Sequence, residues 1–158
     1  MRKKIIQQAA EKETPAAQKW LDLQHLAQVE LTSEDAAYPI ERAIASEAGS
    51  GWKATEPGEQ SIRFIFDEPQ KIGRIQIRFR ETDLERTQEF LLRWLPAGTG
   101  SYQEILRQQY NFSPPHATEE YEDYTVDLNA VQAIELVIIP EISGGSARAS
   151  LAQLQVGP

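Results

Sequence analysis

The stretch Ala43-Ile-Ala-Ser-Glu-Ala-Gly-Ser-Gly-Trp52, followed by Ser61-Ile-Arg-Phe-Ile-Phe66 and Ile72-Gly-Arg-Ile-Gln-Ile-Arg-Phe-Arg80, decides the fold of this chain. In the two later segments apolar residues recur at every second position, which is the period of a β-strand with one face in a core. The same period returns in segments 89–94 and 133–139, and Gly- and Pro-containing turns lie between the segments. Many short antiparallel strands of this kind predict an all-β sandwich or jelly roll.

Segment 43–52 resembles the Ala-Ile-Asp-Gly-Asn-x-x-Thr-x-Trp loop of discoidin domains, the coagulation factor 5/8 C-terminal type. Four more segments resemble later or earlier parts of that family in the right order, namely 29–39, 89–102, 133–139 and 149–156. The last of them is similar to the closing strand Ile-Ala-Glu-Leu-Glu-Val of the family. The resemblance implies an antiparallel jelly-roll β-sandwich of the galactose-binding-like type over roughly residues 27 to 157.

Composition agrees with one globular domain. A chain of 158 residues with 41% hydrophobic residues can bury one full core. The net charge of −8 disfavours nucleic acid and an anionic membrane surface as partners, because both attract Lys and Arg. The chain has no cysteine, which excludes disulfides, thiol catalysis and Cys-ligated zinc.

Residues 1–25 differ from the rest and predict a helical N-terminal extension ahead of a sandwich domain over 26–158. Thr14 and Pro15 suit a helix start, and Ala16, Trp20, Leu23 and Ala27 would share one helical face. The extension is expected either to pack over one end of the sandwich or to form a docking helix pair that presents Trp20. No secretion signal or bilayer-spanning stretch is visible, so a cytoplasmic location is expected.

Catalytic and metal chemistry finds little support in the sequence. The only histidines, His25 and His116, lie far apart, and no Gly-x-Ser-x-Gly motif occurs. We therefore expect no enzyme, no catalytic residue and no cofactor. An enzyme on this fold, as allantoicases show by resemblance alone, is the third possibility.

The discoidin resemblance also implies a structural calcium in the loop before the Trp. Matched by position, its ligands become Ala45, Glu47, Ser50 and Gln153, so that two anionic ligands are replaced by uncharged groups. Calcium affinity rises with the number of charged oxygen ligands. The loop is thus degenerate, and no metal is expected.

The predicted recognition surface is one end of the sandwich, formed by the loops 45–51, 80–88 and 110–121. Aromatic rings in loops can stack on sugars while polar groups bond their hydroxyls. The candidate ligand-binding residues are Glu47, Arg80, Arg86, Tyr110, Phe112 and His116. The alternative for Tyr110 and Phe112 is that they plug the edge of the sandwich.

Three other groups of residues are interpreted as structural. Trp52 is expected to be a core anchor, and the acidic segment 119–123 a solvated loop. Arg74, Arg78 and Arg80 are expected to cover the outer face of their strand in pairs with acids.

The sequence thus favours a non-catalytic recognition module that binds carbohydrate. The alternative is an intracellular protein-interaction or assembly domain of the same fold, favoured by the helical extension and the lost calcium ligands. The expected partner is a carbohydrate or a protein, and neither nucleic acid nor a membrane.

Overall fold

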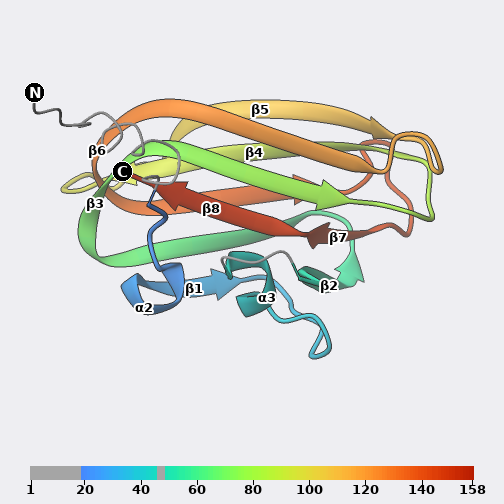
Figure 1. The fold of residues 1–158 in the computed structure, drawn as a ribbon, viewed down its shortest axis with the longest axis horizontal. Helices are drawn as coiled ribbons and strands as arrows, with labels where there is room; N and C mark the ends of the chain where they lie inside the picture. The colour runs from blue at the N-terminus through green and yellow to red at the C-terminus, as the bar shows by residue number, and fades with distance from the viewer. Residues whose placement is uncertain (1–18, 46–48) are drawn as a thin grey trace, which may run out of the picture.

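The computed structural model describes residues 19–45 and 49–158. Its helices and strands are, in chain order, α2 (Leu23–Leu26), β1 (Ala27–Leu31), α3 (Glu41–Ile44), β2 (Trp52–Pro57), β3 (Gln60–Arg80), β4 (Arg86–Pro96), β5 (Gln103–Phe112), β6 (Glu119–Ile139), β7 (Arg148–Leu151) and β8 (Gln153–Gly157). All the pairings between these strands are antiparallel. Figure 1 shows the strands in stacked layers, with the two short helices beside β1 and β2. The predicted all-β sandwich is confirmed.

Two long strands, β3 and β6, belong to both layers. Near Ile62 the first half of β3 pairs with β1 and with the last part of β6, whereas near Ile77 its second half pairs with β8 and with the first part of β6. The register between β3 and β6 shifts between Ile65 and Arg74, and both strands turn at the same end of the molecule (Figure 1). The segment 67–70 is therefore part of β3 and not a turn between two strands. It is a bend inside a continuous strand, made possible because irregular pairing increases local curvature.

The core lies between the layers and follows the alternation seen in the sequence. On β3 the buried apolar side chains are Ile62, Phe64, Phe66, Ile72, Ile75, Ile77 and Phe79. Phe79 meets Phe90 of β4 with ring centres 5.1 Å apart. Full burial of a side chain of this size stabilises the fold by about 1.5–3 kcal/mol. The apolar face of β3 thus supplies core on both halves of the strand.

The N-terminal segment passes from one helical turn into the first strand. Residues 19–22 have no regular structure, only Leu23–Leu26 are helical, and Ala27 opens β1 by pairing with Phe66. The helix expected from Ala16 to Ala27 is therefore wrong over most of its described part, because the chain gains strand pairing instead. Leu21 donates its backbone N–H to the carbonyl of Val156 at 2.8 Å, so this segment packs against β8.

The remainder of the predicted extension lies outside the described residues, and the domain boundary at residue 25 stays a prediction. In the part of the chain that the structure covers, no helix has the length and apolar character needed to cross a membrane.

The arginines on the outer face of β3 pair with acids of β6, as expected. Arg74 donates to Asp123 from Nε at 3.0 Å and from Nη2 at 2.7 Å, and this contact lowers the pKa of the Asp123 carboxyl. Arg78 donates to Glu119 at 3.0 Å. The prediction of a solvated loop over 119–123 is consequently corrected: the segment is the first part of β6, and alternate residues pair with arginines across the strand.

A row of alternating charges crosses the outer face of the other layer. Its members, which we call the charge ladder, occupy neighbouring register positions on β1, β3, β6, β4 and β5, namely Glu30, Arg63, Glu135, Arg93 and Glu104. The central carboxylate of Glu135 is 2% exposed and accepts a hydrogen bond from Nε of Arg63 and from Nε of Arg93, each at 2.6 Å. The ring of Tyr102 lies 4.9 and 5.3 Å from the two guanidinium carbons. Each charge in the ladder thus has an opposite charge beside it.

Candidate functional site

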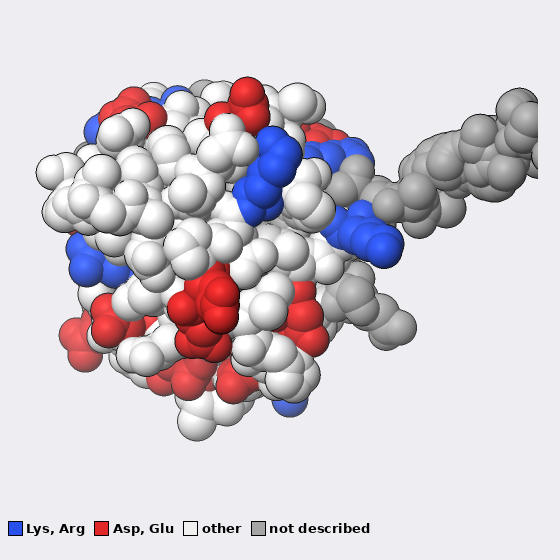
Figure 2. All heavy atoms as spheres, turned by 90° about the vertical axis from the view of Figure 1, so that its left-hand side faces the viewer, with Lys and Arg blue, Asp and Glu red and all other residues white. Residues whose placement is uncertain are grey.

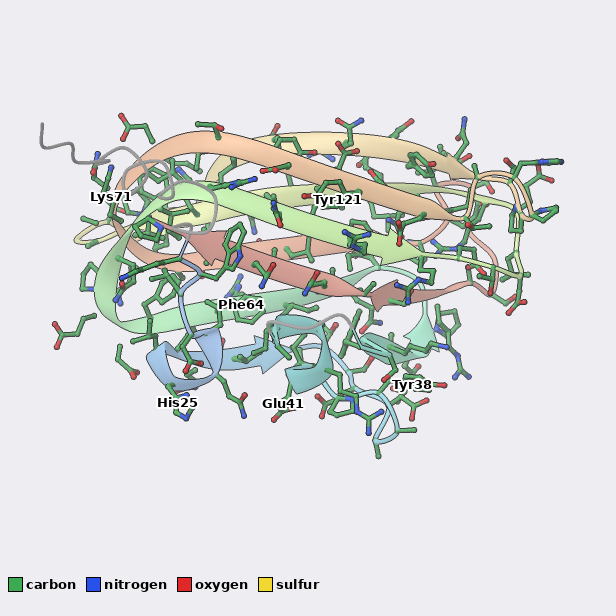
Figure 3. The ribbon with its side chains drawn as sticks, in the orientation of Figure 1. His25, Tyr38, Glu41, Phe64, Lys71 and Tyr121 are labelled. Atoms are coloured by element: carbon green, nitrogen blue, oxygen red, sulfur yellow. The ribbon has the colours of Figure 1, made fainter. Side chains whose placement is uncertain are left out.

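A cleft of about 560 Å³ opens at the end of the sandwich where β2 and β7 pair. Four segments line it, 35–38, 50–54, 80–84 and 146–152. In Figure 3, Tyr38 marks this end of the molecule, and Lys71 lies at the other end, where β3 and β6 turn. The volume falls within the roughly 300–1,000 Å³ typical of small-molecule sites. The cleft is therefore the candidate functional site.

Trp52 forms the floor of the cleft, as a core anchor. The side chain is fully buried, and its indole Nε1 donates to the backbone carbonyl of Ser33 at 3.1 Å. The preceding Gly51 has φ +76°, and a Cβ at that position would collide with the carbonyl oxygen of Leu151. A glycine is thus required where the loop passes closest to β7, and it places Trp52 under the cleft. The structural interpretation of Trp52 is confirmed.

The loop 81–85 forms one wall, and Glu81 holds its shape. The carboxylate accepts the backbone N–H groups of Asp83 at 2.9 Å and Leu84 at 3.0 Å, together with Nε of Arg86 at 2.7 Å. Burial opposes ionisation of Glu81, but these hydrogen bonds and the charge of Arg86 outweigh it and lower the pKa of the carboxyl. Glu81 is therefore committed to the loop and is not available to a ligand.

Arg86 is a structural residue behind this wall, and its predicted ligand-binding role is corrected. Its side chain is 2% exposed and donates to Glu81, to the side chain of Gln88 at 3.0 Å and to the carbonyl of Pro140 at 2.8 Å. The guanidinium carbon lies 4.8 Å from the ring centre of Phe112. An arginine with this many internal partners cannot turn to a ligand without leaving them unpaired.

Phe112 packs against the guanidinium group of Arg86, and Tyr110 packs against Phe112. Phe112 is fully buried, so the expected stacking of a sugar on its ring is wrong. Tyr110 is half-buried and meets Phe112 edge to face, with ring centres 4.9 Å apart. The alternative interpretation, in which these two aromatics plug the edge of the sandwich, describes what the structure shows.

Glu120 lies in the interior behind the same wall. It is 1% exposed, its Oε1 lies 3.4 Å from Nε2 of Gln88, and its Oε2 has no hydrogen-bond partner among the described residues. Burial, and then the neighbouring Glu122, raise the pKa of Glu120 to about 8. This shift favours the protonated, neutral form near pH 7, which is how a carboxyl with no cation at hydrogen-bond distance can stay buried.

Three of the predicted ligand-binding residues remain. Arg80 lines the cleft at the end of β3 and is exposed. His116 is exposed in the turn 113–117, whose neighbour Thr118 accepts the backbone N–H of Glu81. His116 does not line the cleft, and Glu47 lies outside the described residues. Of the five candidates that the structure describes, only Arg80 therefore lines the cleft.

Two oxygens of the degenerate calcium loop accept hydrogen bonds from side chains of this chain. Nε2 of Gln153 donates to the carbonyl oxygen of Ala45 at 3.3 Å, so one oxygen that could face a cation faces an amide instead. The Ser50 hydroxyl accepts from Nη1 of Arg42 at 2.9 Å. Within 19–45 and 49–158, no cluster of three or more His, Asp or Glu side chains is arranged to hold a metal ion. The lack of calcium binding stays a prediction.

Four residues that line the cleft were missed by the sequence analysis, namely Asp35, Tyr38, Lys53 and Arg148. Tyr38 comes before Pro39 in the long connection between β1 and α3. Because binding residues are often found in loops, an aromatic residue in such a connection could have been predicted as a candidate. No pattern in the neighbouring sequence indicates that Lys53 or Arg148 would line a cleft. They meet only because β2 and β7 pair across almost one hundred residues of sequence, with Lys53 opposite Ser150 and Pro57 opposite Arg148.

No protein-family model matches the sequence, and no curated protein matches it. Solved structures do. The family 32 carbohydrate-binding module of NanJ from C. perfringens, in complex with galactose, superposes with a TM-score of 0.65 over 88% of this chain and 98% of that chain, at 16% identity. The chain has the galactose-binding-like β-sandwich fold.

Two further structures support this fold. The C-terminal domain of a chitobiase from Bacteroides fragilis gives a TM-score of 0.62 over 89% of this chain and 98% of that chain, at 18% identity. The family 32 module of AlyQ in complex with 4,5-unsaturated mannuronic acid gives 0.58 over 87% and 97%, also at 18% identity. At these identities the likeness establishes the fold, and the ligand must be argued from the cleft.

Proposed function

We propose that this protein is a non-catalytic carbohydrate-binding module and that the cleft beside β2 and β7 holds the sugar. The observation that carries the proposal is the cleft itself, a loop-built hollow at one end of the sandwich with Tyr38 and several polar side chains on its wall. Sugars bind through aromatic rings that cover their C–H faces and polar groups that bond their hydroxyls. The sugar complexes of NanJ and AlyQ support this use of the fold.

Tyr38 is the aromatic residue best placed for this role. It is half-buried in the connection between β1 and α3, where Asp35 turns the chain by accepting the N–H of Ala37 at 2.9 Å. The ammonium group of Lys53 lies 4.3 Å from the centre of its ring. Trp52 is too deeply buried to contact a ligand, so a stacked sugar would meet Tyr38 on the wall of the cleft.

The test is a glycan array with three forms of the protein. The parent should bind a subset of sugars, and Tyr38→Ala should lose that binding. Tyr121→Ala is the matched control, because Tyr121 is 45% exposed but lies on the outer face of β6 under Arg78 rather than in the cleft. A blank array for the parent chain would reject the proposal, and equal losses for the two tyrosines would reject the cleft as the site.

A protein-interaction domain is the second candidate, and one observation favours it. The outer face of the five-stranded layer has a hollow of about 310 Å³ in which Leu91, Val137 and Ile139 lie half-exposed between charged side chains. Aliphatic side chains at such positions are typical of a surface that another protein covers. A blank array together with a stable complex lost on Val137→Asp would favour this candidate.

A further inference from the structure

Three cations line the cleft from two sides. Lys53 of β2 and Arg148 of β7 point away from the core, because their neighbours Ala54 and Ala149 are buried on the other face of this two-stranded ribbon. Arg80 reaches the cleft from the end of β3. The three charges therefore come from strands far apart in sequence and meet around one hollow.

These cations are poorly matched by acids. Lys53 and Arg148 belong to none of the ion pairs formed within residues 19–45 and 49–158. Arg80 has one long contact, 3.8 Å from its Nη2 to an oxygen of Glu119, and both side chains are well exposed. An exposed pair at that distance contributes little and leaves the guanidinium free to bind another anion.

The acids of the cleft are largely committed to its own backbone. Asp35 accepts an N–H in its turn, and Glu81 is saturated by Arg86 and two N–H groups. Only Asp83 among the acids that line the cleft accepts no hydrogen bond from the described residues. Neutral N–H donors leave the charge of Asp35 in place, Asp83 keeps its own, and Arg86 balances Glu81. The three cations that line the cleft therefore face two uncompensated acids, a small excess of positive charge on a chain that carries −8.

Figure 2 looks at the end where β3 and β6 turn, and both acidic and basic side chains are visible there among uncharged surface. The described surface of that end thus carries both signs of charge, and Lys71 there is within 3.4 Å of Asp127.

We propose that the cleft selects a carboxylated sugar and that Lys53, Arg80 and Arg148 recognise its carboxylate. The inference rests on the proposed sugar-binding function and deepens it. A guanidinium group presents two parallel N–H donors that fit the two oxygens of a carboxylate, and an ammonium group adds a mobile point charge. A hexuronate or a sialic acid could supply the carboxylate.

The experiment is a calorimetric titration of the full chain with trigalacturonate, sialyllactose and the neutral sugar galactotriose. At low ionic strength we expect at least one acidic sugar to bind on the order of tenfold more tightly than galactotriose, since one charge-assisted contact of about 1.5 kcal/mol has that effect. Arg148→Gln and, separately, Lys53→Gln should remove most of that preference. Trigalacturonate and sialyllactose identify which source of carboxylate the cleft accepts.

Lys71→Gln is the matched control, because it removes the same charge from the opposite end of the molecule (Figure 3). It should leave the preference unchanged, and melting curves should show that each variant is folded. Equal binding of galactotriose and both acidic sugars would overturn the inference while the proposed function stands. Loss of the preference in Lys71→Gln would also overturn it, whereas no binding of any sugar on the array would reject the proposed function itself.

Discussion

The charge ladder and the cleft both gather charged side chains, but they satisfy them differently. In the ladder, five strands place acids and bases alternately, and the central Glu135 receives a hydrogen bond from an arginine on each side. In the cleft, Lys53 and Arg148 have no ion-pair partner in the described part of the chain. The paired row contributes to the stability of the fold, whereas the unpaired cations of the cleft remain accessible to an anionic ligand.

The buried carboxyl group of Glu120 shows a third way in which the fold accommodates an acidic side chain. Glu120 is as buried as Glu135, and it stands on the same strand, β6. Its neighbours are Gln88 and Glu122 rather than arginines at hydrogen-bond distance, so it avoids the cost of a buried charge by staying protonated. One strand thus carries two buried carboxyl groups whose surroundings require opposite chemistry.

The largest effect is expected from breaking the ladder at its centre. Glu135→Gln keeps the size of the side chain but leaves Arg63 and Arg93 without their shared anion. We expect the free energy of unfolding to fall by about 3 kcal/mol, as for two lost bonds to a charged group, moderated because both arginines can still reach water. Urea unfolding monitored by fluorescence measures this loss.

Glu104→Gln is the control for that measurement. Glu104 ends the same ladder, but its side chain is 53% exposed, so its removal should change the free energy of unfolding by less than about 1 kcal/mol. Equal losses for the two variants would show that burial and pairing do not distinguish the members of the ladder. Sugar binding should be unaffected in both, because neither residue lines the cleft.

A smaller, pH-dependent effect is expected at Glu120. Its pKa rises from an ordinary 4.5 in the unfolded chain to about 8 in the fold, so the folded state holds a proton that the unfolded chain has released. Stability from this group is complete below pH 4.5 and falls as the pH rises towards 8. Glu120→Gln, which cannot ionise, should melt on the order of 5 °C higher than the parent at pH 9 and near the parent at pH 4.5.

The neighbouring Glu119→Gln serves as the comparison, since Glu119 is exposed and paired with Arg78. It should not reproduce the rise at pH 9. If Glu120→Gln melted below the parent at both pH values, Glu120 would have to be ionised in the fold. It would then belong with Glu135 as a matched charge.

The sequence predicted the elements whose signal is local. Alternation on β3 placed Ile62 and Ile77 in the core, and the position of Trp52 between the discoidin-like loop and a strand predicted a core anchor. The sequence did not predict the direction of side chains that depends on pairing with a distant strand. Glu120 looks like a solvent-exposed acid, and only its register opposite Phe79 turns it inward.

The site was predicted in part for the same reason. Arg80 and the loop 81–85 lie at the expected end of the sandwich. Arg86 and Phe112 were predicted to lie in loops, but Arg86 begins β4, Phe112 ends β5, and both side chains are buried. Lys53 and Arg148 meet through a strand pairing that no local pattern specifies. Residues that gain their role from a distant strand cannot be found from spacing alone.

The smallest effect is expected from calcium, at the loop that adjoins the cleft. Ala45 and Gln153 stand where the discoidin pattern has carboxylates, and the Gln153 amide already occupies the carbonyl oxygen of Ala45. A ligand stabilises a fold by RT ln(1 + [L]/Kd), so a site lacking charged oxygens should leave the melting temperature unchanged in millimolar calcium. Ala45→Asp combined with Gln153→Glu restores both carboxylates and should create calcium-dependent stabilisation, while Gln155→Glu, two residues along β8, should not. A parent protein that melts several degrees lower after chelation would contradict this expectation and show that neutral oxygens suffice to hold a cation in this loop.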